Sequence, residues 1–215
     1  VRLKSSLKKA FLDLGGKIHE NQTIIKIETD KDVINLISTH KRFTCSKLIL
    51  ATGSWTKSVF SNSFSINLPI RPVKGVTIEL SEKEKKQNFS HNLWFKKIYI
   101  APRINGNLVV GATEEDVGFD TKVNLDEMFF LIKNMWEAIP NGKNYNFLKF
   151  RSGLRPTTFD GYPVIGTLNK ISKNIICAFG HYRNGVLLAP ETANLVCDLI
   201  KKNKNKYEFL LPDRF

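Results

Sequence analysis

The sequence predicts an α/β (α+β) fold of two domains, in which the chain leaves the first domain and later returns to it. Leu48–Leu50 is a continuous apolar stretch, as in a strand covered on both faces, and it runs into the glycine turn of "ATGSWT". From residue 68 to about residue 150, long β-rich stretches are separated by loops, which predicts an antiparallel sheet. A second buried strand at residues 174–180 precedes a long helical pattern, so we expect the chain to return to the first domain.

The first domain begins with an amphipathic helix. Apolar residues at helical spacing predict this helix over Leu3–Leu14, and the glycine pair that follows stops it. We then expect short strands at residues 17–20, 23–29 and 33–39, because apolar and polar side chains alternate there. The buried strand, its glycine turn and the helix starting near Ser54 suggest the βα unit of a nucleotide-binding domain.

The later elements follow from the same signals. Residues 124–139 predict one amphipathic helix with Asn124 as its cap. Residues 151–165 are dense in turn formers, and "DGYPVIG" predicts a tight turn leading into a strand. A helix is expected from Asn184 to Ile200, followed by a polar tail with an apolar end.

Composition narrows the functional classes. The 215 residues are 42% hydrophobic and 25% charged, which is typical of a globular protein. The net charge of +13 comes from lysines spread along the chain, and no nucleic-acid recognition motif accompanies it, so we expect no nucleic-acid partner. Cys45, Cys177 and Cys197 show no metal-ligand spacing and are expected to be buried free thiols in a reducing compartment. No transmembrane run and no signal peptide are visible, so a cytoplasmic location is expected.

Two glycines, Gly180 and Gly185, bracket the sequence His181-Tyr182-Arg183-Asn184 at the start of the last helix. A glycine-flanked turn at a helix N-terminus presents backbone N–H groups and partial positive charge. It suits an anion or an electron-rich edge of a flat cofactor. The alternative is an ordinary loop and helix cap with Arg183 in solvent.

Two further side chains are candidates for a binding site. Arg155 lies between Leu154 and Pro156, and a guanidinium in apolar surroundings needs a partner, most naturally a carboxylate bound by two hydrogen bonds. An internal salt bridge to Asp160 is the alternative. Tyr99 lies on a predicted strand of the antiparallel region, where its position alone favours simple packing.

The motifs "LILATGSWT", "YIAPR", "GNLVVGATEE", "GLRPTTFDGYPVIG" and "GHYRNGVLLAPETA" occur in this order. Together they resemble the D-amino acid oxidase and glycine oxidase family of FAD enzymes, and most of all the glycine oxidases of thiamine biosynthesis. The resemblance runs from Val1 to Ile200. It implies an incomplete FAD-binding Rossmann-like domain interleaved with an antiparallel-sheet substrate domain. The boundaries that it implies are 1–66 for the rear part of the FAD-binding domain, 67–150 for the substrate domain, 151–205 for the return and 206–215 for the tail.

The sequence departs from the family at its front. The family's βαβ unit with G-x-G-x-x-G, which holds the FAD pyrophosphate, has no counterpart here, and "LGGK" at residues 14–17 ends a helix instead of opening one. The chain therefore looks like the C-terminal part of a longer enzyme, as a split gene, a truncated gene model or a pseudogene product. A separately encoded N-terminal half would complete it.

The resemblance also implies residue roles. FAD would bind noncovalently, since Gly153 and its neighbours offer no cysteine for attachment. Arg155 would bind the amino acid carboxylate, Tyr99 would donate a hydrogen bond to it, and Arg183 would face the substrate side of the flavin. The implied FAD contacts are Ile24, Ala51, Thr52, Gly53, Gly180, His181, Arg183, Asn184, Gly185 and Val186. For His181, a structural or flavin-contact role is favoured over that of a base.

The implied reaction is oxidation of glycine or another small amino acid. Hydride would pass from the substrate Cα to the flavin and leave an imine, and oxygen would reoxidise the flavin to give hydrogen peroxide. Three alternatives stay open at this point. One is a D-amino acid or sarcosine dehydrogenase that passes electrons to a carrier. The second is a noncatalytic remnant that binds no flavin, and the most distant is a protein that binds through its basic surface.

Overall fold

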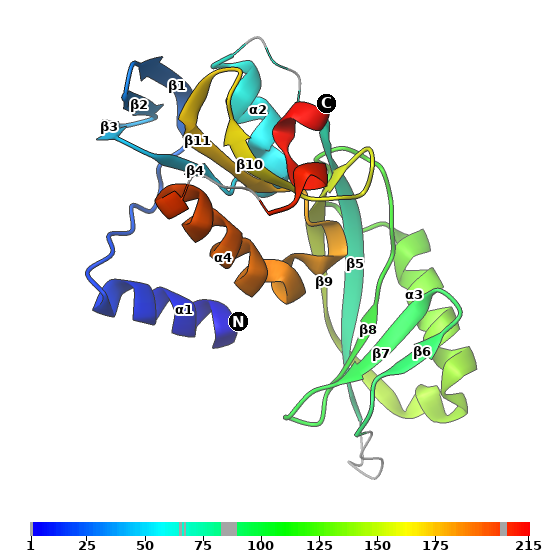
Figure 1. Cartoon of the computed structure of the whole chain (residues 1–215). Helices are drawn as coiled ribbons and strands as arrows, with labels where there is room; N and C mark the ends of the chain where they lie inside the picture. Colours follow the sequence, from blue (N-terminus) through cyan, green and yellow to red (C-terminus); the bar gives the residue numbers. More distant parts are fainter. Residues whose placement is uncertain (1, 65, 67, 83–89, 203–205) are drawn as a thin grey trace.

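The computed structural model describes residues 2–64, 66, 68–82, 90–202 and 206–215. Figure 1 shows two parts. One part contains two three-stranded sheets with the helices α1 and α4, and the other contains a five-stranded sheet with the helix α3. The mixed helix-and-sheet fold with an antiparallel sheet in its middle section confirms the predicted fold class.

The first part begins with α1 (Arg2–Asp13), none of whose residues is buried. The strands β1 (Ile24–Asp30), β2 (Val33–Ser38) and β3 (Arg42–Cys45) then form an antiparallel sheet in sequence order. The strand predicted at residues 17–20 is wrong, because this segment is an irregular connection that pairs with no described strand.

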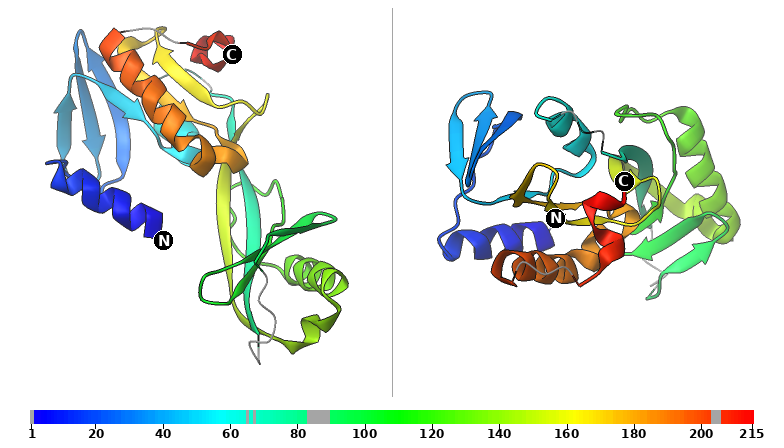
Figure 2. Two further views of the ribbon diagram at one scale, coloured as in Figure 1. Left: turned by 60° about the horizontal axis from the view of Figure 1, so that its bottom comes forward. Right: turned by 45° about the horizontal axis from the view of Figure 1, so that its top comes forward.

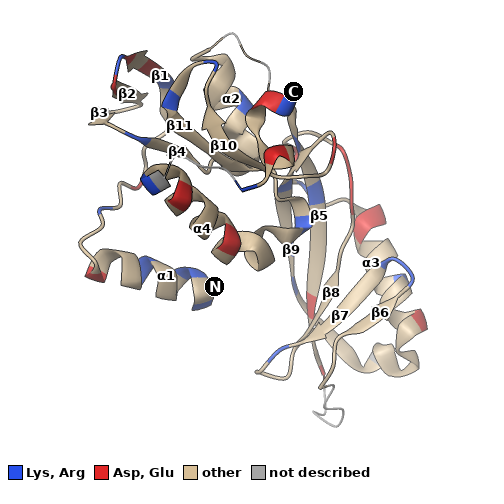
Figure 3. Ribbon diagram, in the orientation of Figure 1, with Lys and Arg blue, Asp and Glu red and all other residues tan. Residues whose placement is uncertain are grey.

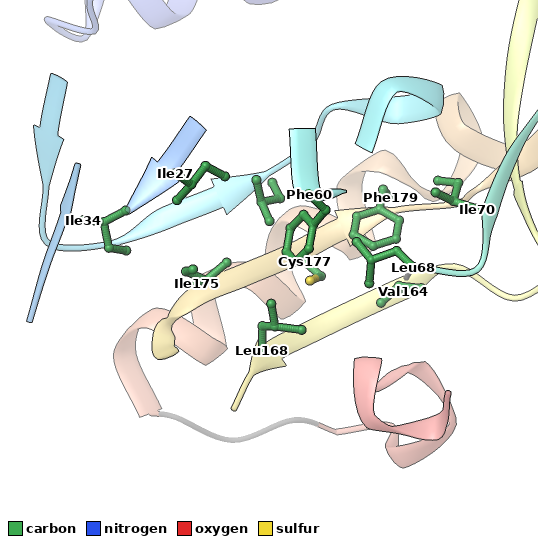
Figure 4. Close-up of a cluster of buried hydrophobic side chains, with 11 residues drawn as sticks. Ile27, Ile34, Phe60, Leu68, Ile70, Val164, Leu168, Ile175, Cys177 and Phe179 are labelled. Atoms are coloured by element: carbon green, nitrogen blue, oxygen red, sulfur yellow. The ribbon is translucent and has the colours of Figure 1, made fainter. Parts of the chain in front are cut away.

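The second small sheet joins segments from both ends of the chain. Its order is β10 (Val164–Leu168), β11 (Ser172–Phe179) and β4 (Leu48–Leu50), with β11 parallel to β4. One face contributes to the hydrophobic core in Figure 4, where Phe60 and Phe179 are fully buried. Leu195, Val196 and Leu199 of α4 (Gly185–Lys202) pack against the other face.

The prediction that Leu48–Leu50 is covered on both faces is wrong for this chain. Ile49 remains 45% exposed. Within the described residues β4 is the last strand of its sheet, so one side of its backbone has no strand partner. An apolar sequence indicates that a strand should be covered on both faces, but in this chain the cover at Ile49 is incomplete.

The five-stranded sheet is antiparallel throughout, as predicted. Its order is β6 (Leu93–Phe95), β7 (Ile98–Pro102), β8 (Leu108–Gly111), β5 (Ile70–Glu82) and β9 (Tyr145–Thr158). The helix α3 (Leu125–Ala138) covers one face through Leu131 and Met135, and Asn124 and Glu127 form its capping box. The Asn124 cap is therefore confirmed.

The long strands β5 and β9 connect the two parts, as the left view of Figure 2 shows. The turn formers at residues 151–158 do not interrupt β9, because each residue of this stretch pairs with a residue of β5. The turn follows at residues 159–161, where Gly161 has a φ of 77°. The strand thus runs through the boundary predicted at residue 150.

Smaller elements complete the chain. They are η1 (Gly53–Trp55), α2 (Thr56–Ser61), η2 (Pro140–Asn144), η3 (Tyr182–Asn184), η4 (Glu208–Leu210) and η5 (Pro212–Arg214). Of the cysteines only Cys177 is buried. Cys45 is half-buried and Cys197 is exposed on α4, so the prediction of three buried thiols is wrong for Cys197. No helix in the described segments has the length and hydropathy needed to cross a membrane.

Candidate functional site

Arg155 lies on β9, opposite Val73 of β5. Its guanidinium folds over Gly75, where a Cβ atom would come within 2.1 Å of Nη2. Nη1 donates hydrogen bonds to the backbone carbonyls of Thr113, at 3.1 Å, and Lys74, at 3.3 Å. A glycine on the neighbouring strand therefore makes room for the guanidinium, and two carbonyls fix its orientation.

The charge of Arg155 has no carboxylate partner in the described part of the chain. The alternative of a salt bridge to Asp160 is wrong, because Asp160 pairs with Arg214 at 2.7 Å. Burial, and then the positive charge of Arg183, lowers the pKa of Arg155 below its usual value. The remaining N–H groups of this guanidinium are available to an incoming anion, and a carboxylate matches their fork.

Tyr99 lies on β7, between Trp94 of β6 and Gly111 of β8. A Cβ atom at Gly111 would approach the Tyr99 hydroxyl to 2.8 Å, so the phenol lies over a second glycine. The Trp94 and Tyr99 rings contact each other with centroids 5.6 Å apart. Tyr99 also acts weakly on the pKa of Arg155, which places both side chains in the same region.

The glycine-flanked turn is fixed to two elements. Gly180 has a φ of 83°, a conformation that favours glycine. A β-bridge joins His181 to Thr157, two residues beyond Arg155 on β9. The His181 ring nitrogen Nε2 is 2.9 Å from the Thr192 hydroxyl of α4. The turn is therefore attached to the end of β9 and to the helix that follows it.

Arg183 forms an ion pair with Glu114, and the Tyr182 hydroxyl donates a hydrogen bond to the same carboxylate. The Arg183 side chain is half exposed, as the alternative of Arg183 in solvent expects, but it is paired there with Glu114. The hydrogen bond from Tyr182 holds the pKa of Glu114 below its usual range, and the charges of Arg183 and Arg155 act in the same direction. The sequence alone assigns no role to Glu114. The signal was an acidic run in "GATEED", directly after a buried strand.

A cavity of about 920 Å³ lies beside these groups. It is lined by charged side chains of β5, of the segment after β8 and of the start of α3, together with Arg183. Figure 3 shows acidic residues on the segment between β8 and α3, next to basic residues of β5. Arg155 and Tyr99 do not line this cavity, but Arg155 contacts its wall at Thr113. We therefore define the candidate site by the contacts around Arg155, with this cavity as its neighbour.

A shallower depression of about 280 Å³ lies between β4, β11 and α4. It brings together Ala51, His181 and Gly185, three of the residues that the sequence predicts to contact FAD. Its other walls include the small side chains of Ala178 and Ala189, which leave space for a flat group. The remaining predicted contacts Thr52, Gly53, Gly180, Asn184 and Val186 adjoin these residues in the chain.

Ile24 is separate from this group. It begins β1 and packs against the core of the first part, and it lines neither cavity.

The family model described as "FAD dependent oxidoreductase" (DAO) matches residues 2–199. The chain belongs to this family. The glycine oxidase of Bacillus subtilis is 31% identical over 202 residues, which are 94% of this chain and 54% of that protein. The bifunctional protein ThiO/ThiG of Nostoc is 32% identical over 199 residues, covering 92% of this chain and 28% of that protein.

The solved structures agree with the sequence comparison. The crystal structure of glycine oxidase from Geobacillus kaustophilus matches with a TM-score of 0.90 and 26% identity, covering 98% of this chain and 57% of that one. The chain thus spans a little more than half the length of the glycine oxidases that it matches. The predicted family and its FAD dependence are confirmed, and the individual roles of the site residues stay predictions.

Replacing Gly75 with Ala should displace the Arg155 guanidinium, because the new methyl group would occupy its position. We expect roughly tenfold weaker binding of a small carboxylate such as glycolate, measured by NMR titration, with little loss of stability. Gly153 is the matched control, since it pairs with Gly75 and has open space around its Cβ position. Equal affinities in Gly75→Ala and Gly153→Ala would contradict this account.

Burial lowers the pKa of His181, so the folded state favours the neutral ring. The stability that this provides is fully present above the unfolded pKa of about 6.5 and is lost as the pH falls through the lower folded pKa. We expect the free energy of unfolding in urea to decrease from pH 8 to pH 5, and to decrease less in His181→Gln. The exposed His91→Gln variant is the control and should retain the full dependence.

Proposed function

We propose that this chain provides the substrate-binding part of an FAD-dependent oxidoreductase that oxidatively deaminates glycine or another small amino acid. The observation that carries the proposal is Arg155, a half-buried cation held by two carbonyls, with no carboxylate partner among the described residues. Within a family of FAD-dependent oxidoreductases, the carboxylate of an amino acid is the natural ligand for this group.

In this proposal Arg155 binds the substrate carboxylate by two hydrogen bonds, and Tyr99 donates a third. Arg183 stays paired with Glu114 at the edge of the site, so its charge contributes to the field without competing for the same oxygen atoms. Fixing the carboxylate in this way orients the substrate Cα, which is how such residues lower a reaction barrier.

FAD would bind noncovalently along the depression between β4 and α4. The small residues there fit the edge of a flat ring system, and the start of α4 contributes partial positive charge. Bound FAD supplies the two-electron oxidation. We further propose oxygen as the electron acceptor and a place in thiamine biosynthesis, because the relatives include glycine oxidases and ThiO/ThiG proteins.

The partner that we propose is a segment supplying the other half of the fold, on the same or on a separately encoded polypeptide. The surface that supports it includes the side of β4 that has no strand partner among the described residues, together with apolar side chains that remain exposed. Ile49 is 45% exposed, and Val186 and Leu187 at the start of α4 are 75% and 78% exposed. Strand addition at β4 would satisfy its backbone and cover this surface.

Arg155→Lys tests the function. In the enzyme reconstituted with the segment that carries the G-x-G-x-x-G unit, glycine added without oxygen should bleach the flavin absorption. The substitution should raise KM on the order of 10- to 100-fold, because lysine cannot form the two-pronged contact. Arg151→Lys on the same strand is the control, since Arg151 already pairs with Glu79. An unchanged kcat/KM in Arg155→Lys would refute the carboxylate role, and a colourless complex would favour the noncatalytic alternative.

Ile49→Asp tests the partner. A charge at this exposed position of β4 should prevent copurification with the segment that carries G-x-G-x-x-G. Ile104→Asp is the matched control, because Ile104 is 95% exposed in the β7–β8 turn, away from the proposed interface. Copurification of the Ile49→Asp chain at the parent's level would place the partner elsewhere.

A further inference from the structure

Lys74 is a fully buried cation beneath the candidate site, with 1% of its side chain exposed. Its ammonium group contacts three acceptors: Glu115 Oε2 at 3.0 Å, Glu127 Oε1 at 3.1 Å and the carbonyl of Lys122 at 3.1 Å. Burial alone would lower the pKa of Lys74, but the hydrogen bonds to the two carboxylates outweigh it and hold the pKa above its usual value. All three donors of the charged group are therefore used.

Glu127 is equally buried and contacts three groups. Oε2 accepts the backbone N–H of Asn124 at 2.8 Å, which caps α3. Oε1 contacts Lys74, and the Thr113 hydroxyl donates to it at 3.4 Å. The Thr113 hydroxyl also accepts the backbone N–H of Val76. One carboxylate thus joins α3 to β5 and to the segment after β8.

These contacts converge on the residues that hold Arg155. Its two backbone acceptors are the carbonyls of Lys74 and Thr113, whose side chains both contact Glu127. Lys74 and Glu115 also exchange two backbone hydrogen bonds, at 2.8 and 3.0 Å, which fix the Lys74 carbonyl. The buried ion pair and the Arg155 guanidinium are therefore both connected to the backbone of Lys74 and Thr113.

We propose that Lys74 and Glu127 are positioning residues for Arg155. The buried pair fixes the separation and direction of the two carbonyls, and these carbonyls in turn aim the free side of the guanidinium toward the substrate carboxylate. The inference rests on the proposed carboxylate role of Arg155. It adds that the affinity of the site for a carboxylate depends on an ion pair that does not touch the ligand.

The alternative is that the pair only stabilises the fold, and charge-balanced replacement separates the two roles. Lys74→Met/Glu127→Gln removes both fully buried charges together, and the carboxylate that loses its cation is that of Glu115, whose side chain is 32% exposed. Glutamine also keeps the capping box with Asn124. A purely structural pair predicts that this double variant retains the parent's Arg155 geometry and carboxylate affinity. If the pair positions Arg155, the double variant should stay folded, but it should lose the parent's Arg155 geometry and part of its carboxylate affinity.

The experiment uses the 215-residue chain, because every contact described for Arg155 lies within it. The first measurement is the NMR order parameter of the Arg155 Nε–Hε group, which we expect to fall from about 0.85 to below about 0.6 in the double variant. The second is titration with glycolate, whose affinity should fall roughly 2- to 10-fold. Glu79→Gln is the matched control, because it removes a poorly exposed carboxylate on β5 that does not contact Arg155, and it should leave both values unchanged.

The same titration in an Arg155→Lys background distinguishes failure of the proposed carboxylate role from failure of the positioning role. There the double substitution should cause no additional loss of glycolate affinity. If Arg155→Lys alone leaves the affinity unchanged, the proposed carboxylate role fails, while the order parameter still tests positioning. If Arg155→Lys weakens binding but the double variant keeps the parent's order parameter and affinity, the positioning role is overturned.

If the double variant does not fold, Glu127→Gln alone replaces it in the test. This substitution weakens the contact with Lys74, and Lys74 keeps Glu115 as a partner. The same loosening of Arg155, smaller in size, supports the proposal, and an unchanged Arg155 in this variant overturns it.

Discussion

The pairing of β5 with β9 is the constraint on which the rest of the site depends. Its register runs from Ile70 opposite Thr158 to Glu82 opposite Tyr145, with one irregularity near Leu80. In a sheet a shift of one residue would turn every side chain to the other face. The register therefore decides that Arg155 lies next to Gly75, where its guanidinium has room, instead of next to a bulky side chain. The same strands connect the two parts of the chain, so packing in either part supports this alignment.

The second constraint is electrostatic. Around the site most cations have a carboxylate within reach: Arg71 has Asp116, Lys74 has Glu115 and Glu127, and Arg183 has Glu114. Arg155 has backbone carbonyls instead. Carbonyl dipoles orient a guanidinium without neutralising it, so its charge remains available to an anion. Because acidic groups nearby are already paired with other cations, they compete little for Arg155.

The sequence predicts much of this fold, since hydrophobic patterns and turn residues are local signals. The antiparallel sheet, the capped helix at Asn124 and the turn at Asp160 follow from them, and the family motifs identify Arg155. What the sequence could not show depends on distant contacts. Asp160 pairs with Arg214, 54 residues away, and Glu114 meets Arg183 across 69 residues. The roles of Gly75 and Gly111 appear only when a neighbouring strand places a side chain over them. The apolar character of Ile49 indicates that this side chain needs to be covered, but it does not show whether this chain supplies the cover.

The two parts of the molecule differ in how much of each proposed binding site they supply. The contacts that orient Arg155 come from β5, β9, the segment after β8 and α3, which pack around one hydrophobic core. The proposed cofactor site, by contrast, is a depression beside exposed apolar side chains and beside the side of β4 that has no strand partner among the described residues. In the function proposed above, recognition of a carboxylate needs only residues described in this chain, whereas oxidation needs a second surface to enclose the flavin. The proposal therefore makes carboxylate binding and redox activity separable, and it expects the first to be measurable in this chain without the second.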